Sequence, residues 1–161
     1  MLKPAILYKD EIQRKMQEYF YTEDMMLECG DILGNWSPSI EETEDGTEQW
    51  AILNGDEVIG YFTYHINWYS SCVSRFGLMS FDRGNSIIGF DIGIKMLELA
   101  RGFRRVEWRM VGGKPVEKHY DKFCNKFGGT KYILKDAIKD RKGIYRDDVI
   151  YVILKENSDE R

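Results

Sequence analysis

The hydrophobic period of the chain changes abruptly near residue 82, and this change constrains the fold more than any other feature. Before it, residues 57–70 and 73–81 are rich in β-branched and aromatic side chains, which favours strands. Residues 49–53 precede them across a tight-turn sequence, Asn-Gly-Asp at 54–56. After the turn sequence at 82–86, apolar residues recur with the spacing of one helix face: Ile88, Ile92, Met96 and Leu99. The pattern predicts an antiparallel meander of about three strands that runs directly into a helix.

The flanking segments predict helices before this unit and further strands after it. The polar, acidic residues 34–48 are expected to form a loop. The other expected elements are helices at 9–20, Asp24–Cys29 and 116–127, the last introduced by Pro115, and strands at 103–111, 130–137 and 144–154.

This order of elements predicts an α/β (α+β) fold with a mixed, mostly antiparallel central sheet. About six or seven strands are expected, with helices on both faces of the sheet. A length of 161 residues fits one domain over residues 1–161, with flexible ends at about 1–4 and 157–161.

Composition excludes several classes of protein. The net charge of −4 lacks the basic character of a nucleic-acid binder. No apolar run has the length of a membrane span, and the first residues lack the apolar core of a signal peptide. Cys29, Cys72 and Cys124 are far apart, which fits reduced thiols, and neither histidine is spaced from them as a metal ligand. We expect a cytoplasmic protein, monomeric or homodimeric, that acts without metal, nucleic acid or membrane.

The junction between the last strand of the meander and the helix is the candidate ligand site. It reads Phe81-Asp82-Arg83-Gly84-Asn85-Ser86 and continues to Gly89. A strand that enters a helix through a glycine turn presents free backbone N–H groups, which bind anions such as a pyrophosphate. The Arg83 guanidinium would add a charge-assisted contact. The same residues also fit an ordinary turn with Asp82 or Ser86 as the helix N-cap, so both interpretations stay open.

Around this junction the chain resembles the GNAT N-acetyltransferase family. The resemblance covers about residues 49–155 and is carried by the segments GLMSFDRGNSIIGFDIGIKMLELARGFRRVEW and GGKPVEKHYDKFCNKFGG. The chain departs from the family in two segments. Ser86 and Ile88 stand where its Gln/Arg-x-x-Gly-x-Gly/Ala turn has glycine and glycine or alanine, and Gly113 or Lys114 replaces an asparagine.

The resemblance implies a binding site for acetyl-CoA in a gap between strand residues 79–81 and 106–110. Backbone amides near 78–81 would bind the pantetheine, and those of 83–89 would bind the pyrophosphate. The cofactor-binding residues so implied are Met79, Ser80, Phe81, Arg83, Gly84, Asn85, Ser86, Ile88, Gly89 and Tyr120.

The resemblance also implies the acid that protonates the leaving thiolate. Tyr120 matches the family's tyrosine through Tyr-Asp-Lys at 120–122, and Cys124 is a second candidate because of its distance from Gly128. A core tyrosine on an amphipathic helix would occupy the same position as Tyr120. For the base, Glu107 and His65 are candidates beside an ordered water.

The acceptor would be a primary amine that the sequence does not identify. Aromatic residues either line its pocket or form core: Trp36, Trp50, Trp68, Trp108, Tyr64 and Tyr69. The acidic residues 41, 42, 44 and 45 either attract a cationic acceptor, such as a polyamine, an aminoglycoside or a lysine-bearing peptide, or form a solvated loop. The predicted function is an acetyl-CoA-dependent N-acetyltransferase. The alternatives are a GNAT-shaped acyl-CoA-binding module without turnover and an interaction protein without nucleotide.

Overall fold

The computed structural model describes residues 1–22, 28–30, 37–42, 45–82, 84–139 and 143–155. Its elements are, in chain order, β1 (Leu2–Pro4), a 3-10 helix (Ala5–Tyr8), α1 (Lys9–Thr22), β2 (Glu28–Gly30), β3 (Thr47–Asn54), β4 (Glu57–Asn67), β5 (Cys72–Ser80), α2 (Ser86–Gly102), β6 (Arg105–Val111), α3 (Glu117–Lys126), β7 (Thr130–Lys139) and β8 (Tyr145–Leu154). None of the helices in this part of the chain is long and apolar enough to cross a lipid bilayer.

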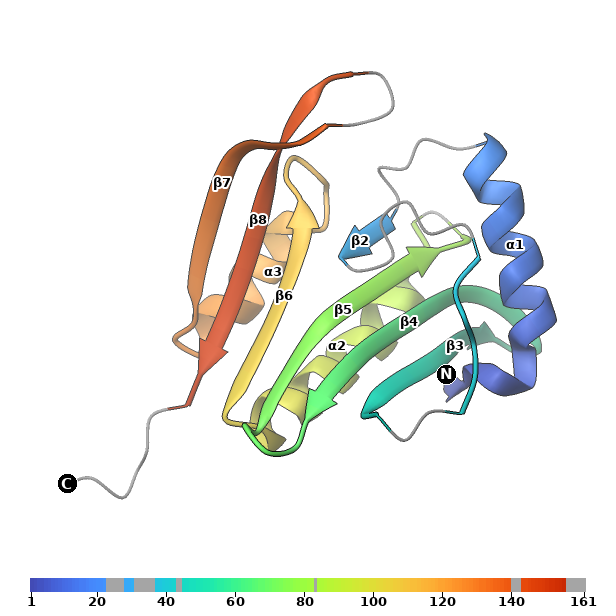
Figure 1. Ribbon diagram of the computed structural model, residues 1–161, viewed down its shortest axis with the longest axis horizontal. Helices are drawn as coiled ribbons and strands as arrows, with labels where there is room; N and C mark the ends of the chain where they lie inside the picture. Colours follow the sequence, from blue (N-terminus) through green and yellow to red (C-terminus); the bar gives the residue numbers. More distant parts are fainter. Residues whose placement is uncertain (23–27, 31–36, 43–44, 83, 140–142, 156–161) are drawn as a thin grey trace.

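All the strands belong to one mixed sheet (Figure 1). Seven of them follow the order β1-β3-β4-β5-β6-β8-β7, and β2 pairs separately with β5. Every pairing is antiparallel except β5 with β6. That parallel pair is joined by α2, as a crossover connection requires. The predicted fold class and sheet type are therefore confirmed.

Strands β5 and β6 pair only at their first residues and then separate. The pairs are Cys72 with Arg105 and Val73 with Val106. Directly afterwards β5 carries a bulge, where its register with β4 shifts and Arg75 takes a positive φ of 55°. A bulge bends a strand and increases its twist. The bend directs β5 away from β6 and leaves an opening between the carboxyl ends of the two strands.

Each face of the sheet has its own apolar cluster. On one face α2 and α3 pack on side chains that include Phe62, Phe76, Trp108 and Tyr151. On the other face α1 packs on Tyr61, Met79 and Phe81 through Ile12 and Met16. Along β4, Tyr61 belongs to the second cluster, whereas Phe62, Tyr64 and Ile66 belong to the first, as the twofold period of a strand requires. Helices therefore cover both faces, as predicted.

The structure differs from the sequence prediction mainly at the N-terminal end. Residues 1–4 are not a flexible end, because Leu2–Pro4 form β1 and pair with β3. The short helix expected at Asp24–Cys29 falls partly outside the described residues, and its last two positions belong to β2. Both strands are too short to show a periodic pattern in the sequence, and tertiary pairing determines them.

Candidate functional site

The opening between β5 and β6 lies beside a small cavity, on the face of the sheet that α2 and α3 cover. The cavity is lined by Phe76 and Leu78 of β5, Trp108 of β6, Ile92 and Met96 of α2, and Tyr120 of α3, among others. Its volume is about 20 Å³, room for about one water molecule. The two strands and the tyrosine-bearing helix that the resemblance implies around acetyl-CoA therefore meet here, together with α2. The cavity is too small for an acylated pantetheine arm without some widening.

The edge of β5 that faces the opening can be identified from the ladder. The Phe81 N–H donates to Ile59 O of β4 at 2.9 Å, and Met79 is paired with Tyr61 two residues earlier. Since backbone groups alternate between the two edges of a strand, Met79 and Phe81 face β4 while Leu78 and Ser80 face the opening. The Met79 and Phe81 side chains also pack on the α1 face. Of the three predicted strand residues, only Ser80 presents its backbone to the opening.

Strand β2 occupies part of this edge. Its Glu28, Cys29 and Gly30 pair with Met79, Leu78 and Gly77. Figure 1 shows the β2 arrow between β5 and β6, inside the opening. The described pairing stops one residue short of Ser80. Binding of a pantetheine arm along Leu78 would therefore require β2 to leave this edge.

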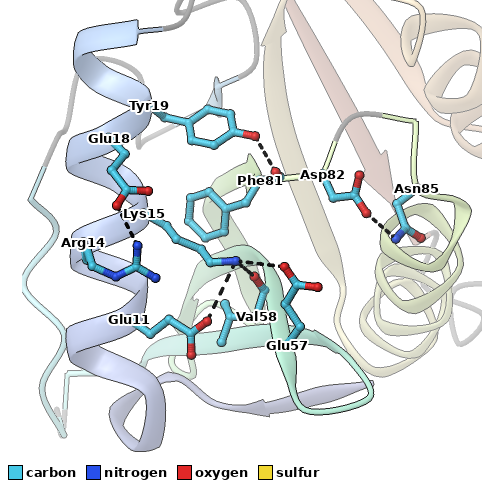
Figure 2. A network of polar contacts seen from close by, with 10 residues as sticks. All are labelled: Glu11, Arg14, Lys15, Glu18, Tyr19, Glu57, Val58, Phe81, Asp82 and Asn85. Carbon is cyan, nitrogen blue, oxygen red and sulfur yellow. Dashed lines mark hydrogen bonds and ion pairs between the residues drawn. The ribbon is translucent and has the colours of Figure 1, made fainter.

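The turn after β5 is ordered by its own side chains. Asn85 is the N-cap of α2, because its Oδ1 accepts from the Ile87 N–H at 3.0 Å. The Asn85 amide also donates to Asp82 Oδ2 at 2.7 Å (Figure 2). The cap is thus Asn85, whereas the turn interpretation of the sequence expected Asp82 or Ser86. Arg83 lies outside the described residues.

Two glycines keep space open at this end of α2. Gly84 has a φ of +76°, a conformation that favours glycine. A Cβ added at Gly84 or at Gly89 would meet no atom within 4 Å. Ser86 is exposed, whereas the Ile88 side chain is only 7% exposed and belongs to the core. The turn therefore fits the close approach of an anionic group at Gly84 and Gly89, while Ile88 offers its backbone only.

Tyr120 lies on α3 at the wall of the cavity. Its ring meets Trp108 and Tyr151 edge-on, each at 5.9 Å between centroids. It is half-buried, and it both packs on the core and lines the cavity. Cys124, the second candidate, is buried against Gly129, and burial raises the pKa of its thiol. It does not line this cavity, which favours Tyr120 as the group near a thioester.

A polar cluster fixes α3 to the last two strands. Lys131 Nζ of β7 lies 2.7 Å from Glu117 Oε1 and 2.8 Å from Asp121 Oδ1. The Tyr151 hydroxyl donates to Asp121 Oδ1 at 2.8 Å. The pKa of Tyr151 is raised, mainly by burial and secondly by this hydrogen bond to a carboxylate. The Gly113 N–H donates to Glu117 Oε2 at 2.8 Å. The loop at Gly113, which departs from the family pattern, is therefore tied to the start of α3.

The two candidate bases lie on the opposite face from Tyr120. Glu107 is the first residue of β6 beyond its pairing with β5 and neighbours Trp108, which faces α3. By alternation its carboxylate is on the other face at the base of the opening, 3.4 Å from Arg105 Nε. His65 lies on β4 with its Nδ1 3.4 Å from Thr47 Oγ1. It shares the α1 side of the sheet and is not brought near Tyr120.

The aromatic residues do not form one acceptor pocket. Tyr64 is a core residue, and burial raises its pKa to about 12. Trp68 and Tyr69 are 71% and 101% exposed, in the turn before β5 and so at the closed end of the β5–β6 pair. Trp108 lines the cavity, and its indole N–H has no hydrogen-bond partner among the described residues. Trp36 and residue 44 of the acidic loop lie outside the described residues.

Several cavity residues were not predicted as site residues. Ile92 and Met96 were expected only as the apolar face of a helix, and Phe76 only as part of a strand. Their residue types carry no sign of ligand contact, because an apolar cavity wall and an apolar core use the same side chains. The order of elements was the available signal, since it places this helix face over the opening.

Comparisons with solved structures assign the fold. No family model matches the sequence, and no curated protein matches it significantly. The structure is similar to a probable GNAT-family acetyltransferase from Chromobacterium violaceum, with 15% identity, a TM-score of 0.59, and coverage of 96% of this chain and 85% of that one. It is also similar to RimL, a ribosomal L7/L12 alpha-N-protein acetyltransferase in complex with coenzyme A, with 13% identity, a TM-score of 0.65, and coverage of 95% and 92%.

A third similar structure is a spermidine N-acetyltransferase SpeG chimera from Vibrio cholerae and hSSAT. Identity is 14%, the TM-score is 0.54, and 69% of each chain is covered. The mixed sheet with its β5–β6 opening thus defines the class of fold, which this chain shares with solved acetyltransferases. The chain has the GNAT fold, in a divergent version, as the sequence resemblance implied.

Proposed function

We propose that the protein transfers an acetyl group from acetyl-CoA to a primary amine. The observation that carries this proposal is the opening between β5 and β6, which adjoins a cavity walled by Tyr120 and lies near the glycine turn at the start of α2. The named activities of the similar structures, including RimL and SpeG, support the same class of reaction.

The residues present fit acetyl-CoA in part. Open space at Gly84 and Gly89 and the N-terminus of α2 suit the pyrophosphate. The Leu78 and Ser80 edge suits the amide-bearing pantetheine, once β2 has left it. The negative charge of Asp82 would repel an anion. Its carboxylate is already engaged, because it accepts a hydrogen bond from the Asn85 amide. In this arrangement the thioester reaches the cavity beside Tyr120.

Acetyl-CoA supplies an activated acyl group, and the chain supplies position and proton transfer. The amine nitrogen attacks the thioester carbonyl carbon through the opening. The carbon–sulfur bond then breaks, and the Tyr120 hydroxyl gives its proton to the departing thiolate. The amine loses its proton on the opposite face, to Glu107 or to water. The acceptor is expected to approach from that face.

The position of β2 favours a second candidate, a protein of the same fold that binds acyl-CoA without turnover. A strand already paired at Leu78 limits access to the thioester position. The two functions differ in one observable, the release of free CoA thiol. An acetyltransferase releases it in proportion to an added amine, whereas a binding module does not.

The test combines a panel of amines with a substitution at Tyr120. We expect amine-dependent thiol release from acetyl-CoA, and a loss of at least about tenfold in kcat for Tyr120→Phe, because general acid catalysis is typically worth about 10²–10⁴-fold. Tyr132→Phe, on exposed β7, is the matched control. Unchanged kcat for Tyr120→Phe would remove Tyr120 as the acid. Absence of thiol release with every amine, despite CoA binding, would favour the binding module.

A further inference from the structure

Helix α1 reaches the turn after β5 through Tyr19. The Tyr19 hydroxyl donates a hydrogen bond to the Phe81 carbonyl, and the two rings meet edge-on with centroids 5.6 Å apart. Figure 2 shows this contact beside the Asp82–Asn85 pair. Phe81 is the residue that connects β5 to the turn, so α1 holds the turn at its first peptide group.

Both backbone polar groups of Phe81 are engaged. Its N–H, which belongs to the preceding peptide group, is bonded to Ile59 O of the sheet, and its carbonyl accepts from Tyr19. Because a peptide unit is planar and trans, a carbonyl fixed toward Tyr19 directs the N–H of Asp82 to the opposite side, away from α1. The Asp82 carbonyl then accepts from the Asn85 N–H at 3.3 Å and from Ser80 Oγ at 3.0 Å. Hydrogen bonds thus connect Phe81 and Asp82 to the Asn85 N–H at the start of α2.

Helix α1 is itself held against the sheet one helical turn before Tyr19. Lys15 Nζ donates to Val58 O at 2.6 Å and lies 3.4 Å from Glu57 Oε1 and 3.8 Å from Glu11 Oε1. The same ammonium lies 6.0 Å from the centre of the Phe81 ring (Figure 2). The Phe81 ring is therefore contacted by two residues of α1, and α1 is fixed to the beginning of β4.

We propose that Tyr19 is a positioning residue for the phosphate-binding turn. It touches neither the acyl group nor the amine. Its hydroxyl keeps the Phe81 carbonyl on the α1 side, so that the Asp82 N–H faces the ligand side before the ligand arrives. This inference rests on the proposed acetyl-CoA site and adds to it a residue that the sequence pattern of the turn does not contain.

The test is Tyr19→Phe, which keeps the ring packing and removes only the hydroxyl. CoA engages the turn through its pyrophosphate, whereas S-acetyl-pantetheine has none. We expect the Kd for CoA to rise about 5- to 10-fold, the effect of one hydrogen bond. The rate of acetyl transfer from S-acetyl-pantetheine should stay unchanged. Without ligand, amide hydrogen exchange at residues 84–87 should become faster. Tyr8→Phe is the control, since Tyr8 packs on the same apolar cluster as Tyr19.

The possible outcomes distinguish a positioning role of Tyr19 from a purely structural one, and a failure of this inference from a failure of the proposed function. A purely structural role predicts that CoA affinity and S-acetyl-pantetheine turnover fall together, and this result would overturn the inference. Unchanged CoA affinity in Tyr19→Phe, with wild-type binding intact, would also overturn it and leave the proposed function standing. If the wild-type protein bound no CoA, the proposed function would fail, and the inference with it.

Discussion

Glycine at position 89 has opposite effects on helix stability and on the space left for a ligand. It lies in the first turns of α2, where glycine costs helix stability, yet a Cβ there would meet no atom within 4 Å. Gly89→Ala should therefore raise the free energy of unfolding by about 0.5–1 kcal/mol. The same methyl group enters the space assigned to the pyrophosphate, so the Kd for CoA should rise. Chemical denaturation and a CoA titration measure the two effects.

The control for Gly89→Ala is Gly102→Ala. Gly102 lies at the far end of the same helix, and a Cβ there would also meet nothing within 4 Å. This variant should leave the CoA affinity unchanged. If Gly89→Ala gained stability and bound CoA as tightly as the wild type, the pyrophosphate would not lie against Gly89.

At the residue scale, the sequence predicted positions better than roles. Tyr120 lies at the cavity wall. Its place on one face of a helix could be predicted, because the 3.6-residue period of that helix is visible in the sequence. Arg75 could not be foreseen, because its positive φ arises from the register of β5 against β4. Met79 and Phe81 were assigned to the ligand from their place in the chain, but the ladder turns their backbone toward β4. Register depends on partners far away in sequence.

At the scale of elements, β2 determines access to the opening. Since it pairs at Leu78, where the pantetheine is proposed to bind, the two compete for one edge. Cys29→Pro removes a backbone N–H and weakens the strand, whereas Cys29→Ala keeps the N–H. We expect Cys29→Pro to bind CoA more tightly than Cys29→Ala, because β2 covers the edge of β5 in a smaller fraction of the molecules. Isothermal titration of both variants measures the difference. Equal or weaker binding by Cys29→Pro would show that β2 does not compete with the ligand.

The attachment of α3 predicts a pH dependence of stability. Hydrogen bonds from Lys131 hold the pKa values of Glu117 and Asp121 below their ordinary values of 4.5 and 3.8. Groups with a lowered folded pKa stabilise the protein above the unfolded pKa, and this contribution is lost as the pH falls through the folded pKa. Burial lowers the pKa of Lys131, but the two carboxylates raise it overall, so its contribution is lost only at alkaline pH.

Lys131→Met should therefore be more harmful at neutral than at acidic pH. We expect a loss of about 0.5–1 kcal/mol of unfolding free energy at pH 7, the size typical of partly exposed ion pairs, and a smaller loss at pH 3. Urea denaturation at both pH values tests this. Lys122→Met, on the exposed side of α3, should show no such pH dependence. An equal loss for Lys131→Met at both pH values would mean that the ion pairs contribute nothing to the stability of α3.

At the scale of the whole molecule, the order of elements was predictable and the opening was not. Long strands and helices carry a period that survives in the sequence, and their order specified the mixed sheet. β1 and β2 are three residues each and carry no period. The opening results from a bulge, a short parallel pairing and an added strand, all of which depend on contacts between distant segments.

The melting temperature of the wild-type protein with and without CoA tests whether the β5–β6 opening binds acyl-CoA. A ligand that binds only the folded state stabilises it by about 2.7 kcal/mol at a concentration of 100 times Kd. We expect CoA and acetyl-CoA to raise the melting temperature in a dose-dependent way. An unchanged melting temperature at millimolar CoA would contradict it, and would mean that this GNAT fold does not use its opening for acyl-CoA.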